Sequence, residues 1–302
     1  MDHSAFLLLL LTGLGDDAKT PARDPFQISV NVNLVALNAT VRDRRGQFVP
    51  GLREQDFEVY EDGVRQSIRL FRHEDTAVTV GLVIDHSGSM RHKLLEVIAA
   101  ARTFVESSSK DDEMFVVNFN EHVALGLPGA TRFTNRPAML ADAISNAPVR
   151  GMTALYDAIA KAWEQLQTGT RDRRALVVIS DGGDNASARS LTEVLKMAGQ
   201  SSVPIYGVGI FDDEDMDRNP QVLRHLAHAT GGEAFFPNRL DELVATCVRI
   251  ARDIRQQYTL GYVSSNETRP GAYRAIKVVA REPGQRKLSV RTRAGYIAED
   301  GK

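Results

Sequence analysis

Three residues with oxygen-bearing side chains follow an apolar stretch of the chain. Asp85, Ser87 and Ser89 are spaced two apart. One carboxylate and two hydroxyls are the kinds of ligand that a hard divalent cation such as Mg²⁺ or Mn²⁺ prefers. Gly88 lets the turn tighten, so that both hydroxyls can face one point. This spacing often occurs by chance, so its interpretation depends on the rest of the chain.

Two further stretches supply oxygen ligands. Thr153 opens a helical pattern, and Asp181 ends the apolar run 175–180 and is followed by two glycines. The run 78–84, which leads into Asp85, is apolar and largely β-branched, as in a strand buried on both faces of a parallel sheet. Sites in open α/β sheets form where strands end at their carboxyl edge. We therefore expect one metal site from five residues: Asp85, Ser87, Ser89, Thr153 and Asp181.

In this order, the five residues resemble the metal-ion-dependent adhesion site of von Willebrand factor A-like domains. The family pattern is Asp-x-Ser-x-Ser, then a Thr, then an Asp before Gly, and the resemblance extends over about residues 77–258. The flanks 57–63 and 258–262 are similar to bacterial proteins called VWFA-related. The resemblance implies that the three hydroxyls bind the cation, Thr153 depending on the ligation state. It also implies that the two carboxylates bind the cation directly or through water.

These residues allow two other interpretations. Ser87 and Ser89 are also suited to capping a following helix, but that role leaves Thr153 and Asp181 unexplained. Zinc binding by His86 and a neighbouring histidine is less expected, because oxygen ligands dominate here. We expect His86 at the rim of the site, in contact with solvent or a partner.

An acidic run, Asp212-Asp-Glu-Asp-Met-Asp217, follows the expected strand 203–211. It would emerge at the same sheet edge as the metal site. It could bind a second cation or set partner preference, but a solvated acidic loop is the simpler expectation.

Composition indicates a soluble globular protein. The chain has 302 residues, with 43% hydrophobic and 25% charged residues and a formal net charge of −2. This charge gives no drive toward nucleic acid or anionic membranes. The single cysteine, Cys247, excludes an intrachain disulfide. Glycine-rich nucleotide loops are absent, and no second carboxylate pair offers a general base, so we expect no enzyme.

Strand and helix patterns alternate between residues 77 and 257. Helices are expected at 94–107, 137–147, 155–166, 191–199, 221–230 and 240–257. Strands are expected at 78–84, 114–119, 175–180, 203–211 and 233–236. This order predicts an α/β fold with a doubly wound, mostly parallel sheet.

The chain on either side of this region reads as β-structure, at 26–71 and 258–297. A hairpin is expected, with strands at 56–60 and 64–71 on either side of Glu61-Asp-Gly63. Neither β segment has enough strands to close a core alone. We therefore expect the two segments to form one small β-sandwich, with the α/β domain inserted between them.

The predicted domain boundaries follow from this pattern. Residues 1–25 are a signal peptide and linker, and 26–75 are the N-terminal β segment. Residues 76–257 are the von Willebrand factor A-like domain, and 258–302 are the C-terminal β segment, packed against 26–75.

Export is expected from the apolar segment 5–14, which has the length of a signal-peptide core and is too short to span a bilayer. A periplasmic or secreted protein follows, although the segment lacks preceding positive charge and a clear cleavage motif.

The leading functional hypothesis is a non-enzymatic adhesion or scaffold module, in which Mg²⁺ or Mn²⁺ captures a carboxylate of a protein partner. One rival is a metal-dependent hydrolase that uses the same cation as a Lewis acid. Another is a cytosolic scaffold of a larger complex. Neither nucleic acid nor a membrane span is expected.

The mature chain is expected to begin after Leu14 and before Phe26, because a signal peptide is removed on export. Mass spectrometry of the native protein tests this. An intact Met1 or Asp2 terminus would contradict it.

Overall fold

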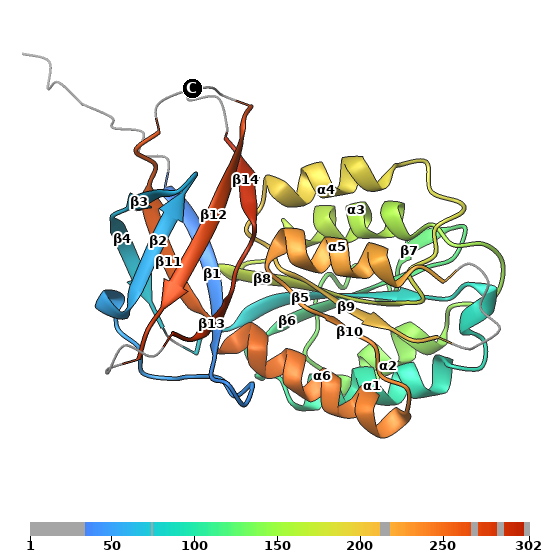
Figure 1. Cartoon of the computed structure of the whole chain (residues 1–302). Coiled ribbons are helices and arrows are strands. Elements are labelled where there is room, and N and C mark those ends of the chain that lie inside the picture. Colours follow the sequence, from blue (N-terminus) through green and yellow to red (C-terminus); the bar gives the residue numbers. More distant parts are fainter. Residues whose placement is uncertain (1–33, 74, 212–217, 267–270, 283–286, 299–302) are drawn as a thin grey trace, which may run out of the picture. The chain divides into compact units, whose positions relative to one another are not determined.

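The computed structural model describes residues 34–73, 75–211, 218–266, 271–282 and 287–298 (Figure 1). Within them, six strands form a central sheet in the order β10-β9-β8-β5-β6-β7. Five run parallel and β7 pairs antiparallel with β6. The strands are β5 (Val78–Asp85), β6 (Glu113–Phe119), β7 (Val123–Leu125), β8 (Arg173–Ser180), β9 (Ile205–Gly209) and β10 (Ala234–Phe235). The predicted parallel sheet is confirmed, and the short edge strand β7 was not predicted.

Helices cover both faces of this sheet, as Figure 1 shows. One face carries α1 (Leu94–Glu106), α2 (Pro137–Ser145) and α6 (Leu240–Arg255). The other carries α3 (Leu155–Leu166), α4 (Leu191–Gly199) and α5 (Pro220–Thr230). This is the doubly wound arrangement that the alternating pattern predicts. None of the helices in the described residues is both long and apolar enough to cross a bilayer.

The central strand β5 is buried along its whole length. Gly81 explains how its neighbours pack so closely. A Cβ at this position would lie 2.5 Å from a ring carbon of Phe115 and 2.7 Å from a methyl of Leu176. Both side chains therefore pack directly against the backbone of β5, which fixes this strand between β6 and β8.

Two antiparallel sheets flank the α/β region. One has the order β13-β1-β11-β4 and the other β14-β12-β2-β3. Strand β1 (Leu34–Arg42) pairs with β11 (Tyr258–Val263), and β2 (Phe57–Glu61) pairs with β12 (Tyr273–Ala280). The remaining strands are β3 (Val64–Gln66), β4 (Ile68–Arg72), β13 (Ser289–Arg291) and β14 (Gly295–Ile297). The chain's two β segments thus pack together as one sandwich, and the α/β domain is inserted between them in the sequence, as predicted.

The hairpin after β2 differs from the prediction in one respect. Its turn lies at Asp62 and Gly63, whose φ angles of 48° and 82° fit a tight hairpin turn. The sequence predicts one strand from Val64 to Phe71, but the structure has two. Strand β3 pairs with β2, and after Ser67 the chain passes into the other sheet, where β4 pairs with β11. A strand that changes sheets forms a corner of the sandwich.

Several predictions fall outside the described residues. These are the signal peptide and linker (1–25), the β pattern before Leu34 and the acidic run 212–217. From Leu34 on, the odd-numbered apolar residues of β1 are buried in the core of the sandwich. The domain boundaries stay a prediction.

The described residues contain two hydrophobic cores, one in the α/β domain and one in the sandwich. Cys247 belongs to the first, and burial raises the pKa of its thiol to about 12, so it is an inert core residue. Tyr258 anchors the second where α6 passes into β11. Its hydroxyl donates to the Val49 carbonyl at 2.7 Å, and its ring lies 5.1 Å from the Phe57 ring centroid.

An ion cluster joins α6 to the sandwich. Asp253 of α6 accepts two hydrogen bonds from Arg42 of β1, at 2.6 and 2.5 Å, and one from Arg291 of β13 at 3.1 Å. The Asp253 side chain is only 4% exposed. Buried charges of this kind are retained only when they are paired.

Replacing Asp253 is therefore expected to destabilise the protein. Asp253→Ala leaves Arg42 and Arg291 without their shared carboxylate and should cost about 3–5 kcal/mol of unfolding free energy, measured by urea denaturation. Arg102→Ala is the control, because the Arg102–Glu106 pair on α1 is exposed and should be worth about 0.5 kcal/mol or less. Equal losses in the two variants would contradict the prediction.

Candidate metal centre

Two carboxylates lie at the ends of neighbouring strands. Strand β5 ends at Asp85, and Asp181 directly follows the last residue of β8. The two strands are parallel neighbours in register, with Ile84 beside Ile179. Both acidic residues are buried: Asp85 has no exposed surface, and Asp181 has 2% of its surface exposed. The carboxyl edge of the sheet therefore holds two acids close together, as the sequence predicts.

Hydrogen bonds fix the orientation of the Asp85 carboxylate. One oxygen accepts from the backbone N–H of Ser87 at 2.8 Å, and the other accepts from the hydroxyl of Ser180 at 2.6 Å. The Ser180 hydroxyl in turn accepts from the N–H of Gly182 at 3.0 Å. The end of β5 is thus tied to the end of β8 through one serine that sequence reasoning missed.

The two serines of the turn after β5 contact the second acid. The Ser89 hydroxyl donates to Asp181 Oδ2 at 2.6 Å, and it lies 3.1 Å from the Ser87 hydroxyl. Neither hydroxyl caps a helix. Ser87 makes no side-chain cap bond to the short 3₁₀ helix at Gly88–Met90, and the residue before α1 is Lys93. The structure brings four of the five predicted residues into one hydrogen-bonded group.

Thr153 follows a loop that lies beside this group. The preceding loop docks against the turn after β5, because the Gly88 N–H donates to the Gly151 carbonyl at 3.1 Å and the Arg150 N–H donates to the His86 carbonyl at 2.9 Å. Gly151 has φ of 77°, and the Glu121 side chain fills the space where a Cβ would stand. Thr153 itself is buried, with 6% of its surface exposed.

The pair of acids carries an electrostatic cost. Burial, together with the charge of Asp181, raises the pKa of Asp85 to about 6, although the bonds from Ser180 and Ser87 oppose the shift. A cation placed between the two acids would remove this cost. Among the described residues, no group of three or more His, Cys, Asp or Glu side chains is placed to bind a metal. Two carboxylates and three hydroxyls nevertheless fit a hard divalent cation.

His86 is not where the sequence placed it. The side chain is 1% exposed rather than at the rim. Its Nε2 lies 3.1 Å from Asn118 Oδ1, while the amide nitrogen of Asn118 donates to the Ala143 carbonyl. His86 Nε2 must therefore donate, and burial lowers the pKa of the ring, so it is neutral. Side chains alternate along an extended strand, and this one points into the core instead of toward the site.

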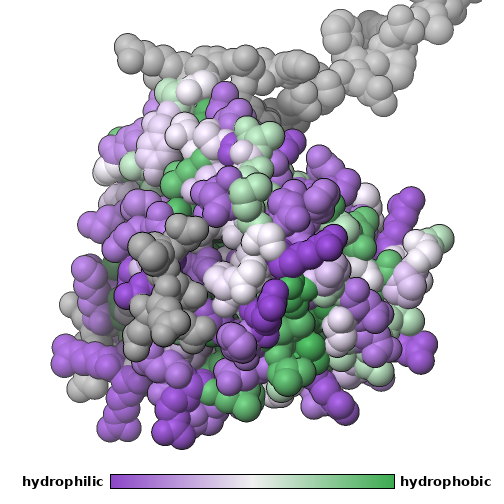
Figure 2. Space-filling model, turned by 90° about the vertical axis from the view of Figure 1, so that its right-hand side faces the viewer, coloured by the Kyte–Doolittle hydropathy of each residue, from purple (hydrophilic) through white to green (hydrophobic). Residues whose placement is uncertain are grey.

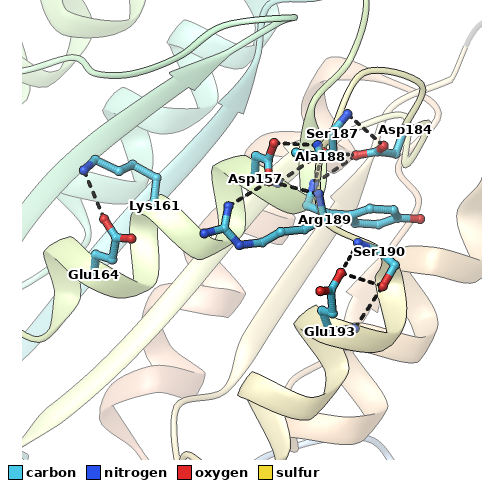
Figure 3. Close-up of polar contacts among 10 residues, drawn as sticks. Asp157, Lys161, Glu164, Asp184, Ser187, Ala188, Arg189, Ser190 and Glu193 are labelled. Carbon is cyan, nitrogen blue, oxygen red and sulfur yellow. Dashed lines mark hydrogen bonds and ion pairs between the residues drawn. The ribbon is translucent and has the colours of Figure 1, made fainter.

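Other residues around the site were also missed. Asp184 and Ser187 lie in the loop after β8 and contact the first turn of α3 (Figure 3). Asn185 of the same loop accepts a hydrogen bond from the backbone N–H of Thr153, just before the helix. The signal was present, since the run Asp181-Gly-Gly-Asp-Asn185 places hydrogen-bonding side chains just past a strand end. Figure 2 shows the face of the molecule at this end, which is mainly hydrophilic with an apolar area. Met152, beside Thr153, is 53% exposed.

Comparison with known proteins identifies the α/β region. The model of the von Willebrand factor type A domain family matches residues 79–246, more than half of the chain. A comparison with curated protein sequences gives no match.

Several solved structures are similar. A von Willebrand factor type A protein from Catenulispora acidiphila has a TM-score of 0.54 at 15% identity, over 81% of this chain and 74% of that one. Proximal thread matrix protein 1 from the mussel byssus has a TM-score of 0.51 at 13% identity, over 65% of this chain and 51% of that one. The pilus adhesin SpaC from Lactobacillus rhamnosus GG has a TM-score of 0.50 at 10% identity, over 81% of this chain and 48% of that one. This chain matches only about half the length of the last two. At such identities the likeness shows the fold alone.

The raised pKa of Asp85 predicts how stability depends on pH without metal. Between the unfolded value of about 4 and the folded value of about 6, only the folded state binds the proton. Stability in EDTA should therefore fall as pH rises through this window and stay low above it. Asp85→Asn has no such fall, and should be more stable than wild type at pH 7.5 by about 3 kcal/mol. Urea denaturation between pH 4 and 7.5 tests this, and parallel curves for the two proteins would refute it.

Proposed function

The chain belongs to the von Willebrand factor type A domain family, and from this we propose that it is a divalent-metal-dependent protein-binding module of the adhesion or scaffold type. Its site residues are Asp85, Ser87, Ser89, Thr153 and Asp181, which would bind Mg²⁺ or Mn²⁺. The bound cation would supply a Lewis-acidic position for a carboxylate of a protein partner.

The observation that carries the proposal is the contact between Ser89 and Asp181 beside the buried Asp85. Ligands from two strand ends and one turn converge there, and the two acids lie close enough for the charge of Asp181 to raise the pKa of Asp85. Two carboxylates and one divalent cation sum to about zero charge. A cation at this site therefore remains attractive to an acidic group from outside.

A binding role is favoured over hydrolysis by the surroundings of the site. The nearest histidine, His86, is buried and donates to Asn118. Glu121 accepts from the Met152 N–H at 3.1 Å and so serves the loop that carries Thr153. Both groups are engaged in the framework of the site, which leaves neither positioned as a general base for an incoming substrate.

The kind of partner follows from the chemistry of the bound cation. A carboxylate supplies the hard oxygen ligand that Mg²⁺ prefers at an open coordination position. Exposed Met152 adds apolar surface beside Thr153. We propose a protein partner that offers an Asp or Glu side chain. The exported location stays a prediction, because residues 1–33 lie outside the described part of the chain.

Metal binding should raise the melting temperature. A ligand that binds only the folded state at 100 times its Kd adds about 2.7 kcal/mol of stability, or about 5–10 °C for a protein of this size. Asp85→Ala and Asp181→Ala should fold and lose the response to Mg²⁺. Asp241→Ala, which removes an exposed carboxylate on α6, should keep it.

Thermal melts with Mg²⁺, Mn²⁺ and EDTA, combined with elemental analysis, decide the point. Melting curves of the wild type that EDTA leaves unchanged, with no metal bound, would refute the proposal. Capture of a partner on the immobilised protein should likewise require Mg²⁺ and fail with Asp85→Ala.

A further inference from the structure

The loop after β8 and the start of α3 are joined by hydrogen bonds in both directions. We define the β8 loop as residues 184–189, and the α3 entry as residues 153–157. Figure 3 shows Ser187 and Arg189 of the loop pointing toward Asp157 of the entry, and Asp184 bonded to Ser187. Asp181 lies just before the β8 loop, and Thr153 is the first residue of the α3 entry. Each of the two segments is therefore next to a proposed metal ligand or contains one.

Both backbone groups of Thr153 are hydrogen-bonded to the β8 loop. Its N–H donates to Asn185 Oδ1 at 2.8 Å, and its carbonyl accepts from the N–H groups of Asn185 and Ala186, each at 3.0 Å. Three bonds from two adjacent residues leave the backbone of Thr153 little freedom. The only side-chain atom among these partners belongs to Asn185.

The first turn of α3 is held by the same loop. The Tyr156 N–H donates to Asp184 Oδ2 at 3.0 Å, and the Tyr156 and Asp157 N–H groups both donate to the Ser187 hydroxyl at 3.1 Å. That hydroxyl donates to Asp184 Oδ2 at 2.6 Å. The opening N–H groups of a helix lack partners within the helix, and here the β8 loop supplies them.

The α3 entry also accepts hydrogen bonds from the β8 loop. The Asp157 carboxylate accepts from the Ala188 N–H at 2.8 Å and from the Arg189 guanidinium at 2.9 Å. Each segment thus satisfies backbone groups of the other, so neither can shift alone without leaving polar groups unpaired.

We propose that Asn185 is the positioning residue for Thr153, and that the β8 loop sets where this hydroxyl stands relative to Asp181. The inference rests on the proposed function. Residues that orient metal ligands without touching the metal strongly affect metal affinity, and their loss typically weakens it about 10–100-fold. A merely structural Asn185 would change stability and leave metal affinity alone.

Three variants of the full chain separate these roles. Asn185→Ala removes the acceptor for the Thr153 N–H, whereas Asn185→Asp keeps an acceptor oxygen in the same place. Ser190→Ala is the matched control. Ser190 lies one residue beyond the loop, and its hydroxyl accepts from the Glu193 N–H at 3.3 Å to cap α4. Its loss should lower the melting temperature without touching Thr153.

Two quantities are measured for each protein: the Kd for Mg²⁺ and Mn²⁺ by calorimetric titration, and amide hydrogen exchange of residues 153–157 in EDTA. Asn185→Ala should weaken metal binding about 10–100-fold and speed exchange at Thr153. Asn185→Asp should bind close to the wild-type affinity. Ser190→Ala should keep both the affinity and the exchange of the entry.

The alternative outcomes are distinct. Wild-type affinity in Asn185→Ala, with the wild type binding metal, overturns the positioning role and leaves the proposed function standing. Equal loss of affinity in Asn185→Asp and Asn185→Ala shows that the acceptor oxygen is not what matters, and also overturns it. A wild type that binds neither metal overturns both proposals.

Discussion

The arrangement of the sheet's carboxyl edge depends on the burial of two like charges, Asp85 and Asp181, at neighbouring strand ends. Such a pair is unfavourable in a low-dielectric interior unless donors or a cation surround it. Ser87, Ser89 and Ser180 direct an N–H or hydroxyl at these carboxylates. The loop after β8 supports these donors. Gly182 is in the left-handed region with φ of 80°, and its N–H donates to the Ser180 hydroxyl.

Much of the fold follows from local pattern. The run 78–84 is apolar throughout and proves to be a strand buried on both faces, and each stretch with helical spacing forms a helix within a few residues of its expected ends. Metal-site candidates are also visible in sequence, because Asp85 and Asp181 stand at strand ends and Thr153 stands just before a helix. The two aspartates lie close together because parallel strands end on one edge of the sheet.

What the sequence does not show are contacts between segments far apart in the chain. The polar run Arg65-Gln-Ser67 interrupts the apolar residues of 64–71, but it does not show that the chain changes sheets there. The inward direction of His86 depends on the register of β5 against Asn118 of β6. Asn185 looks like an ordinary loop residue until its partner, the backbone of Thr153, is seen. These features depend on tertiary geometry rather than on propensity.

The insertion of one domain into the other also dictates an order of folding. Strand β1 needs β11 as its neighbour, and Tyr258 bonds Val49 across 209 residues of chain. A ribosome therefore releases half a sandwich, with unpaired strand edges, long before the other half exists. The α/β domain is contiguous and can form first, and its folding brings the ends of its segment together and shortens the loop that the sandwich must close. Until β11 and β12 arrive, the nascent β1–β4 segment has unpaired strand edges, which are sites of aggregation.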